Sequence, residues 1–293
     1  IKDVMRSGEK TEAFMYDVKY RKIVRADYDD DDSIFYRGRY SKSRLKKADM
    51  FHIPFKEAYR IKNQRFSLTG LPLLYLANTP QTVAYELESE QEECTFTDLY
   101  VSQYKFCGNP EKKVLNMLDL RIQLTDSNHE NYNIYDINSE CQFKKYIERF
   151  ILSCVCSFPA IHRNENFVEE YVIPQLVTQE VKRSTKCDGI CYNSALHNEE
   201  SCVNFVLFTQ RSSDTGVDEE LRRLFEITNP VTARDILPGC NGDSINSIEC
   251  IESITQYYTR LNKEVRRSAH ELSEKSRTKL DKQYAKILEI CTK

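Results

Sequence analysis

The chain has 293 residues, of which 40% are hydrophobic and 30% charged, and its net charge is −3. This length allows one sizeable domain or two small ones, and the composition is typical of a soluble globular protein. So small a net charge gives no field that would recruit nucleic acid or an acidic membrane. No apolar run approaches the roughly eighteen residues of a membrane-spanning helix, and residues 1–10 are too polar for a signal peptide. We therefore expect a cytoplasmic protein without a nucleic-acid or membrane partner.

Eleven cysteines in a chain without a signal peptide indicate reduced thiols rather than a disulfide framework. Four possible zinc ligands fall close together, at Cys187, Cys191, His197 and Cys202. However, residues 188–193 are predicted to form a strand, in which positions four apart lie about 13 Å from each other. Tetrahedral zinc needs its sulfur ligands within about 4 Å of one another. We therefore expect no metal site.

The N-terminal part of the chain, residues 1–32, is polar and weakly helical in pattern and ends in the acidic run Asp29–Asp32. Consecutive carboxylates repel one another, so this run is typical of a solvated linker. The following residues, Ser33 to Arg39, have the pattern of a strand that enters the core. Residues 51–55 form an apolar anchor that is interrupted by proline.

A strand followed by a helix is predicted next. Leu73 to Ala77 is short, apolar and bounded by turn residues, which indicates a buried strand. Asn78 or Thr79 can cap a helix whose first residue is Pro80 and which extends to about Gln91. On this helix Glu86 falls at the edge of the apolar face, where a carboxylate can reach a binding site without being fully buried.

Further strands are predicted over residues 95–107, 113–120 and 202–209, and further helices over residues 142–158 and 171–183. On the last helix the apolar side chains of Ile173, Leu176, Val177 and Val181 are expected to face inward. The elements do not follow a strict strand–helix–strand repeat, so the fold class is predicted to be α+β. We assign residues 33–210 to this domain.

The remaining residues, 211–293, are predicted to be a helical extension. Residues 219–227 have the pattern of a short helix. After them, apolar residues recur at spacings of three and four, at Ile245, Ile248, Ile251, Ile254, Tyr258, Leu261 and Val265, and again at Leu280, Tyr284 and Ile287. This pattern predicts an amphipathic helix or helical hairpin. Packing against the core is the default expectation, and a homodimer seam is the alternative.

Two segments far apart in the sequence carry the most informative motif. Residues 65–86 place Arg65, Tyr75 and Glu86 ten and eleven residues apart, and Ser194 ends the segment Asp-Gly-Ile-Cys-Tyr-Asn-Ser that precedes an apolar strand. With Tyr36-Arg37 upstream and Gly70 before the tyrosine strand, this arrangement resembles the RES domain, a family named for its Arg, Glu and Ser. The resemblance covers residues 33–209. One departure is Gln-Arg-Phe-Ser at 64–67, where many members have Gly-Arg-Trp-Asn, because Ser67 changes the hydrogen bonding around the arginine.

The resemblance implies an ADP-ribosyltransferase-like core of β-sheets with flanking helices and a central cleft. It implies that NAD+ is the substrate and that no metal is needed. The reaction implied is cleavage of the nicotinamide–ribose bond, with water (a glycohydrolase) or inorganic phosphate (a phosphorylase) as acceptor. Such an enzyme would be a growth-arresting toxin or defence effector with a separate antitoxin. The implied catalytic residues are Glu86, Arg65, Tyr75 and Ser194, and the implied NAD-binding residues are Arg37, Arg39 and Tyr36.

These residue types suit that chemistry. Breaking the glycosidic bond places positive charge at C1′ of the ribose, which a carboxylate can stabilise. An arginine fork suits the pyrophosphate, an aromatic face packs on the nicotinamide or its ribose, and a hydroxyl can orient the reacting groups. Arg37 and Arg39 compete for one phosphate-binding role, and strand alternation places both on the same face.

Alternatives remain open at this stage. Judged singly, Arg65 can be a surface ion-pair partner, Tyr75 a core tyrosine, Glu86 a solvated helix residue and Ser194 a turn cap. His52 is taken as structural, because a cation-like mechanism needs no general base. A second hypothesis is transfer of ADP-ribose to a protein from the same site. A third is a non-catalytic module that binds a nucleotide or a partner.

Overall fold

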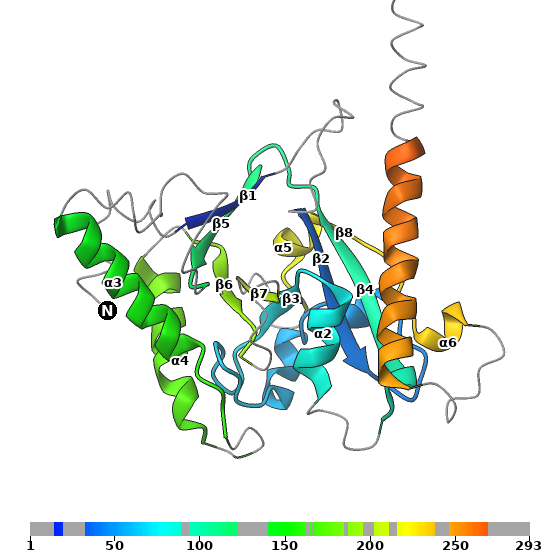
Figure 1. Cartoon of the computed structure of the whole chain (residues 1–293), viewed down its shortest axis with the longest axis horizontal. Coiled ribbons are helices and arrows are strands. Elements are labelled where there is room, and N and C mark those ends of the chain that lie inside the picture. The colour runs from blue at the N-terminus through cyan, green and yellow to red at the C-terminus, as the bar shows by residue number, and fades with distance from the viewer. Residues whose placement is uncertain are drawn as a thin grey trace, which may run out of the picture.

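The computed structural model describes residues 15–19, 33–88, 94–121, 140–161, 165, 167–184, 187–195, 202–210, 216–237 and 246–268 (Figure 1). In this part of the chain eight strands form one mixed sheet in the order β1-β5-β6-β7-β3-β2-β4-β8. Their bounds are β1 Met15–Lys19, β2 Ile34–Tyr40, β3 Leu73–Ala77, β4 Leu99–Phe106, β5 Val114–Asp119, β6 Gly189–Asn193, β7 Val203–Phe208 and β8 Phe225–Ile227.

The helices flank this sheet. They are α2 Pro80–Leu87, α3 Glu140–Cys156, α4 Val172–Ser184, α5 Glu219–Arg223 and α6 Ala233–Ile236, with 3-10 turns η3 Lys47–Met50, η4 Phe55–Arg60, η6 Phe96–Asp98 and η8 Glu169–Tyr171. A further helix, here called the C-terminal helix, covers residues 247–268. This mixture of helices with a mainly antiparallel sheet is the α+β class that the sequence predicted. None of the helices described is long and apolar enough to cross a membrane.

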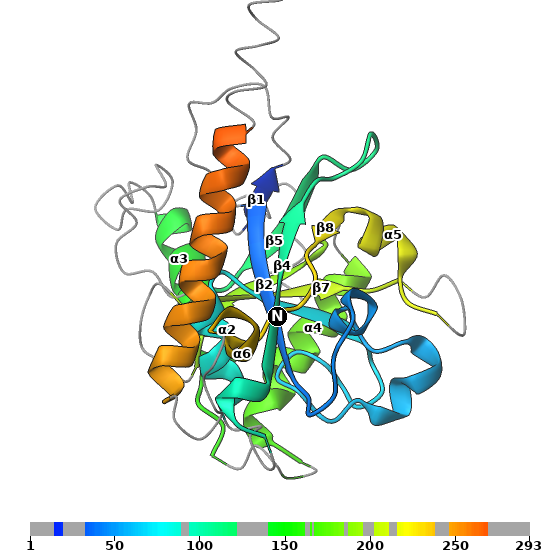
Figure 2. The ribbon, with the colours of Figure 1, turned by 90° about the vertical axis from the view of Figure 1, so that its right-hand side faces the viewer.

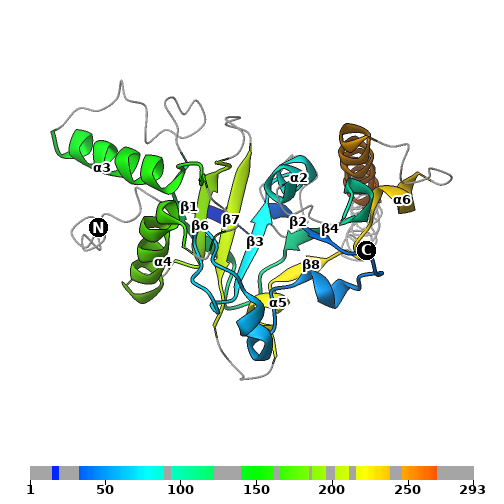
Figure 3. The same cartoon turned by 90° about the horizontal axis from the view of Figure 1, so that it is seen from below.

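The sheet has little strand pairing between β2 and β3. Neighbouring strands run antiparallel, apart from the parallel pair β5 and β6. β2 and β3 share the single residue pair Tyr36 and Ala77, whereas β3 pairs with β7 along its full length. The sheet therefore consists of two halves with a short junction, where the sequence had led us to expect separate sheets. Figure 3 shows α2 lying over this junction.

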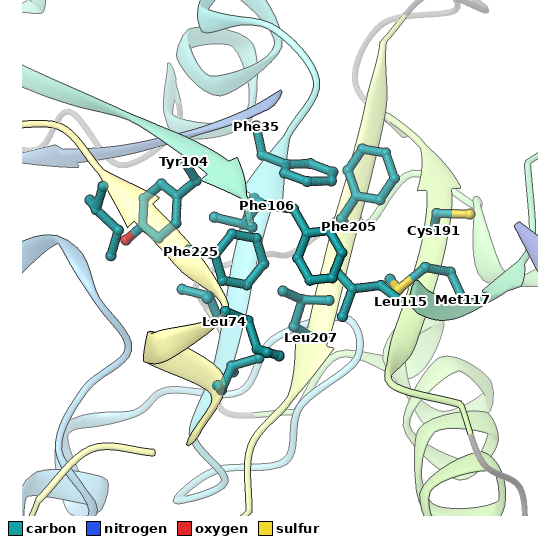
Figure 4. Packing of buried hydrophobic residues seen from close by; sticks show 14 of the residues in the cluster. Phe35, Leu74, Tyr104, Phe106, Leu115, Met117, Cys191, Phe205, Leu207 and Phe225 are labelled. Atoms are coloured by element: carbon teal, nitrogen blue, oxygen red, sulfur yellow. The ribbon is translucent and has the colours of Figure 1, made fainter. Parts of the chain in front are cut away.

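A first core cluster covers one face of both halves. Alternate residues of β3 and β7 reach it, including Leu74 and Phe205, and Phe35 joins it from β2. The ring of Phe35 meets that of Phe205 at 4.9 Å and that of Phe225 at 6.2 Å between centroids (Figure 4). Because strand side chains alternate between faces, these contacts assign the odd-numbered positions of β2 and β7 to this face.

Two more clusters lie on the opposite face. The second packs α3 and α4 against β5, β6 and β7, with Val177 and Val181 fully buried as predicted. Leu176, which we expected to face inward, is 47% exposed, so that expectation is wrong. The third cluster packs α2 and the C-terminal helix against β2 and β4, as Figure 2 shows. Its centre is Tyr258, whose ring meets the Tyr36 ring at 5.3 Å.

The structure corrects the expectations for both ends of the chain. Residues 15–19 form an edge strand that pairs with β5, so the helical tendency expected over 1–32 is wrong there. Residues 219–227, expected to be one helix, divide into α5 and β8, and β8 extends the sheet beside β4. A strand therefore forms within the segment that was expected to be a helical extension. The C-terminal helix packs on the core, while Leu280, Tyr284 and Ile287 lie outside the described residues.

Candidate active site

The start of α2 fixes where Glu86 lies. Thr79 caps the helix by accepting a hydrogen bond from the Thr82 backbone N–H at 3.0 Å, and Pro80 is its first residue, as predicted. The described helix ends at Leu87, and the predicted residues 89–91 lie outside the described part of the chain. Glu86 therefore projects from the last turn of a short, well-capped helix.

The carboxylate of Glu86 joins three elements. The Ser194 hydroxyl, just after β6, donates a hydrogen bond to Glu86 Oε1 at 2.6 Å. The side-chain amide of Asn204, on β7, donates to the same oxygen at 2.7 Å. Ser194 and Asn204 are both buried, while Glu86 is half-buried. Two segments that are more than a hundred residues apart in sequence thus meet at one carboxylate oxygen.

Tyr75 lies on β3, on the same face of the sheet as Asn204. The Phe66 backbone N–H donates to the Tyr75 hydroxyl at 3.3 Å, which ties the loop that carries Arg65 to this strand. Burial raises the pKa of Tyr75 to about 12, although hydrogen bonds with the Ser67 side chain and the Phe66 backbone oppose the shift. The hydroxyl therefore stays protonated at physiological pH. It can act as a hydrogen-bond donor.

Tyr192 connects the Arg65 loop with the Glu86 carboxylate. Its ring packs on Phe66 with centroids 4.6 Å apart. Burial and then the negative charge of Glu86 raise the pKa of Tyr192 well above its ordinary value, and the positive charge of Arg65 acts in the opposite direction. Phe66, the neighbour of Arg65, packs on Tyr192, and Asn204, which bonds to Glu86, lies opposite Tyr192 in the sheet, so Arg65 and Glu86 are on the same side of the core.

Arg65 is held by backbone carbonyls rather than by a surface carboxylate. Its Nη1 donates to the carbonyl oxygen of Cys156 at 3.1 Å and to that of Phe158 at 2.7 Å, where α3 ends. A cation is favourable there, because the C-terminal end of a helix carries partial negative charge. The guanidinium also lies over the Tyr171 ring, 5.3 Å from its centroid. The arginine is therefore 8% exposed and fixed in place.

The three residues predicted to bind NAD separate in the structure. Arg37 and Arg39 follow Phe35 at intervals of two on β2, so both lie on the face of the first core cluster, as alternation predicted. Arg37 Nη1 donates to the carbonyl oxygen of Tyr75 at 2.7 Å, across the junction of the two halves. Arg39 Nη1 donates instead to the Asp49 carbonyl oxygen at 2.6 Å.

Tyr36 turns away from both arginines. Its ring packs on Tyr258, and its hydroxyl accepts a hydrogen bond from the Asn262 side chain at 3.4 Å, so it anchors the C-terminal helix. The structure therefore groups Glu86, Ser194, Tyr75 and Arg65 on one side of the core. Tyr36 lies on the same face of the sheet, packed on the C-terminal helix, whereas Arg37 and Arg39 lie on the opposite face, and Arg37 is bonded to the Tyr75 backbone.

From the sequence, His52 could also be considered as a general base, and a group of cysteines with His197 as zinc ligands. His52 Nε2 accepts a hydrogen bond from the Asp218 backbone N–H at 2.8 Å, and burial lowers the pKa of His52, which keeps the imidazole neutral. Cys187, Cys191 and Cys202 are free thiols. His197, the other zinc candidate, lies outside the described residues.

Sequence reasoning missed Asn204, Tyr192 and Tyr171. The signal for Asn204 was present, because it is the one polar residue in the apolar strand Val-Asn-Phe-Val-Leu-Phe. A polar side chain inside such a strand needs a partner and marks a site worth testing. Tyr192 lies inside the Asp-Gly-Ile-Cys-Tyr-Asn-Ser segment that ends at Ser194, although it was given no role, whereas Tyr171 carried no comparable signal among the 18 tyrosines of the chain.

The comparisons with known proteins decide the family. The RES domain model matches residues 39–226, which is more than half of the chain. The chain belongs to the RES-domain family. This match includes β8 nearly to its end, in agreement with the pairing of β8 to the sheet.

Among curated relatives, the RES chain is 29% identical over 209 residues to a Bacillus subtilis (strain 168) protein named "Putative toxin YopC". The alignment covers 67% of this chain and 46% of that protein, so the chain matches less than half the length of its relative. A solved structure, that of the M. tuberculosis MbcT-MbcA toxin-antitoxin complex, matches with a TM-score of 0.36 and 12% identity. That match covers 77% of this chain and 93% of the other.

Proposed function

We propose that this RES domain cleaves the nicotinamide–ribose bond of NAD+ and thereby arrests growth as a toxin or defence effector. The observation that supports it most is the Glu86 carboxylate. It is held by hydrogen bonds from Ser194 and Asn204, on the same side of the core as Arg65 and Tyr75. Among the described residues, both hydrogen bonds to Glu86 end on Oε1. Oε2 is then available to face a substrate.

The reaction needs few groups. The C1′–N bond breaks, its electron pair passes to the nicotinamide nitrogen, and the positive charge moves to the ribose. The carboxylate of Glu86 stabilises this charge and can hold a ribose hydroxyl. A water oxygen then bonds to C1′ and releases a proton to the solvent, or a deprotonated oxygen of inorganic phosphate bonds to C1′ with no proton released. Tyr75, protonated at neutral pH, donates a hydrogen bond to the substrate.

In this proposal Arg65 and Arg37 supply the positive charge that NAD+ binding needs. Arg65 is fixed at the end of α3 and supplies positive charge on the side of Glu86. Both β2 arginines lie on the face of the sheet opposite to Glu86, but Arg37 is bonded to the backbone of the strand that carries Tyr75, whereas Arg39 is bonded to the Asp49 carbonyl oxygen. We therefore assign a pyrophosphate-binding role to Arg37 in preference to Arg39.

A mass-resolved NAD+ assay tests the proposal. The purified protein is incubated with NAD+, with and without inorganic phosphate. Free ADP-ribose indicates a glycohydrolase, phosphorylated ADP-ribose a phosphorylase, and a labelled protein a transferase. Glu86→Gln should abolish NAD+ loss, whereas Glu88→Gln, which changes an exposed carboxylate at the end of the same helix, should not. Stable NAD+ with the wild-type protein would overturn the proposal.

Growth on expression provides the second test. Wild-type protein should arrest growth with a fall in cellular NAD+, and Glu86→Gln should relieve both effects. An unrestrained enzyme of this kind would harm its own cell, so the proposal includes a separate neutralising partner. Growth arrest that Glu86→Gln leaves unchanged would contradict the link between the reaction and toxicity.

A further inference from the structure

Asn204 is an unusual residue for its position. The other five residues of β7 are apolar and buried, and Asn204 itself is 4% exposed. Burying an amide without a partner is costly, so a buried asparagine in an apolar strand is retained only where it bonds to something. Its side-chain nitrogen meets Glu86 Oε1 at 2.7 Å.

The same strand also holds the start of α2. The backbone of Asn78 donates to the Val203 carbonyl at 3.0 Å, and the Val203 N–H donates to Asn78 Oδ1 at 3.1 Å. The Thr82 hydroxyl donates to Asn78 Oδ1 at 2.9 Å. The helix is therefore attached to β7 at its first turn through Val203 and at its last turn through Asn204. This attachment leaves the Glu86 backbone little freedom to move.

The two donors approach Glu86 from neighbouring strands. Asn204 lies opposite Tyr192 in the β6–β7 pairing, and Ser194 follows two residues after Tyr192. A carboxylate that accepts from two directions on one oxygen cannot rotate about its last bond without losing a hydrogen bond. We propose that Asn204 is a positioning residue for the proposed reaction, because with Ser194 it fixes the Glu86 carboxylate so that Oε2 faces the ribose C1′ of NAD+.

This inference rests on the proposed function, and steady-state kinetics test it. Asn204→Leu removes the donor at nearly constant volume. We expect kcat for NAD+ loss to fall about tenfold or more, because a hydrogen bond to a charged group is worth about 1.5–3 kcal/mol. KM for NAD+ should change little. Asn116→Leu, on β5, is the matched asparagine control and should retain wild-type kcat.

Asn204→Asp separates positioning from a merely structural role. The new carboxylate has the same shape but lies against Glu86, and two carboxylates so close cannot both remain ionised without cost. Among the described residues, Tyr192 lies opposite position 204, and the charged and titratable groups that act on Tyr192 are Glu86, Tyr75, Arg65 and Tyr171. Activity should be low at alkaline pH and should recover as the pH falls, because a protonated aspartate can again donate to Glu86.

The outcomes distinguish the two proposals. If wild-type protein leaves NAD+ intact, the proposed function fails and this inference fails with it. A thermal melt checks that Asn204→Leu is folded. If the wild-type protein consumes NAD+ and the folded Asn204→Leu variant keeps the wild-type kcat, the inference alone fails. An Asn204→Asp variant whose activity is lowered equally at every pH would also overturn it, since loss of packing has no such pH dependence.

Discussion

At the scale of single residues, burial decides what Tyr75 can do. Its hydroxyl accepts from the Phe66 N–H and lies against Ser67, the residue that stands where many RES domains have asparagine. Ser67 is fully buried, and its hydroxyl also donates to the Gln64 side chain at 3.1 Å. The serine therefore keeps a hydrogen bond in this part of the loop.

We predict that Tyr75→Phe lowers the rate of NAD+ loss without changing the alkaline side of the pH–rate profile. Because burial raises the pKa of Tyr75 to about 12, the wild-type hydroxyl remains protonated through the range in which an exposed tyrosine ionises, near 10.0. Initial rates of both proteins, measured at matched pH values, check this. A wild-type decline centred near 10.0 that Tyr75→Phe removes would contradict it.

Replacing Arg65 by lysine keeps the positive charge but changes the shape of the side chain, so it tests which of the two the activity and the stability need. We predict that Arg65→Lys lowers both activity and stability, because an ammonium lacks the planar group that lies over the Tyr171 ring while Nη1 donates to two carbonyls. The expected loss in unfolding free energy is about 1–3 kcal/mol, measured by urea denaturation. Arg60→Lys is the control, because Arg60 is half exposed and pairs with Glu57. Equal losses for the two variants would show that Arg65 has no special role.

At the scale of elements, β2 and α2 pack closely at Gly38. A Cβ on Gly38 would lie 2.4 Å from Val83 Cγ1 and 2.8 Å from Leu87 Cδ1. Both side chains belong to the helix that carries Glu86. A methyl group here would therefore push α2 away from β2 and strain its attachment to β7.

We predict that Gly38→Ala lowers activity through the position of Glu86 and destabilises the fold by about 1–3 kcal/mol, as overpacking does. Gly189→Ala is the informative comparison. There a Cβ would lie 2.1 Å from the Val206 carbonyl oxygen, which is part of the β7 backbone and cannot move aside. Urea melts should show the larger loss of stability in Gly189→Ala. Full activity in a folded Gly38→Ala protein would contradict the proposed coupling.

The elements next to the site were largely predictable from the sequence. Residues 73–77 form the expected strand, and Thr79 and Pro80 start the expected helix, because capping and apolar patterning are local signals. That Ser194 would lie near Glu86 was expected from the family resemblance, whereas the hydrogen bond between them was not predicted. The catalytic roles of Glu86, Arg65, Tyr75 and Ser194 remain predictions.

Non-local contacts account for what the sequence did not predict. β1 and β8 are edge strands of five and three residues. Each forms because it pairs with a neighbouring strand, β1 with β5 and β8 with β4. Strand alternation separates Tyr36 from Arg37 and Arg39, but the packing partner of the Tyr36 ring is on the C-terminal helix, which begins about two hundred residues later in the sequence. Periodicity within a short window contains no information about such partners.

At the scale of the whole molecule, the three core clusters share a feature. Each contains at least one buried tyrosine whose pKa burial raises: Tyr104 in the first, Tyr75 and Tyr192 in the second, and Tyr258 in the third. Tyr104 donates to the Met50 carbonyl, and Tyr258 donates to the Val101 carbonyl at 2.7 Å. These phenols join loops and the C-terminal helix to the sheet while protonated.

We therefore predict that the protein loses stability steeply above pH 10.0. A tyrosine with a raised folded-state pKa favours the folded state fully below its unfolded value of 10.0, and this contribution falls as the pH rises toward the folded value. Each such group gives a slope of about 1.4 kcal/mol per pH unit. Tyr258→Phe should lower the slope of unfolding free energy against pH, measured by urea denaturation. Tyr59→Phe, which changes a ring that is 81% exposed, is the control. If both variants keep the wild-type slope, ionisation of the buried Tyr258 does not cause the loss of stability at high pH, and the prediction is wrong.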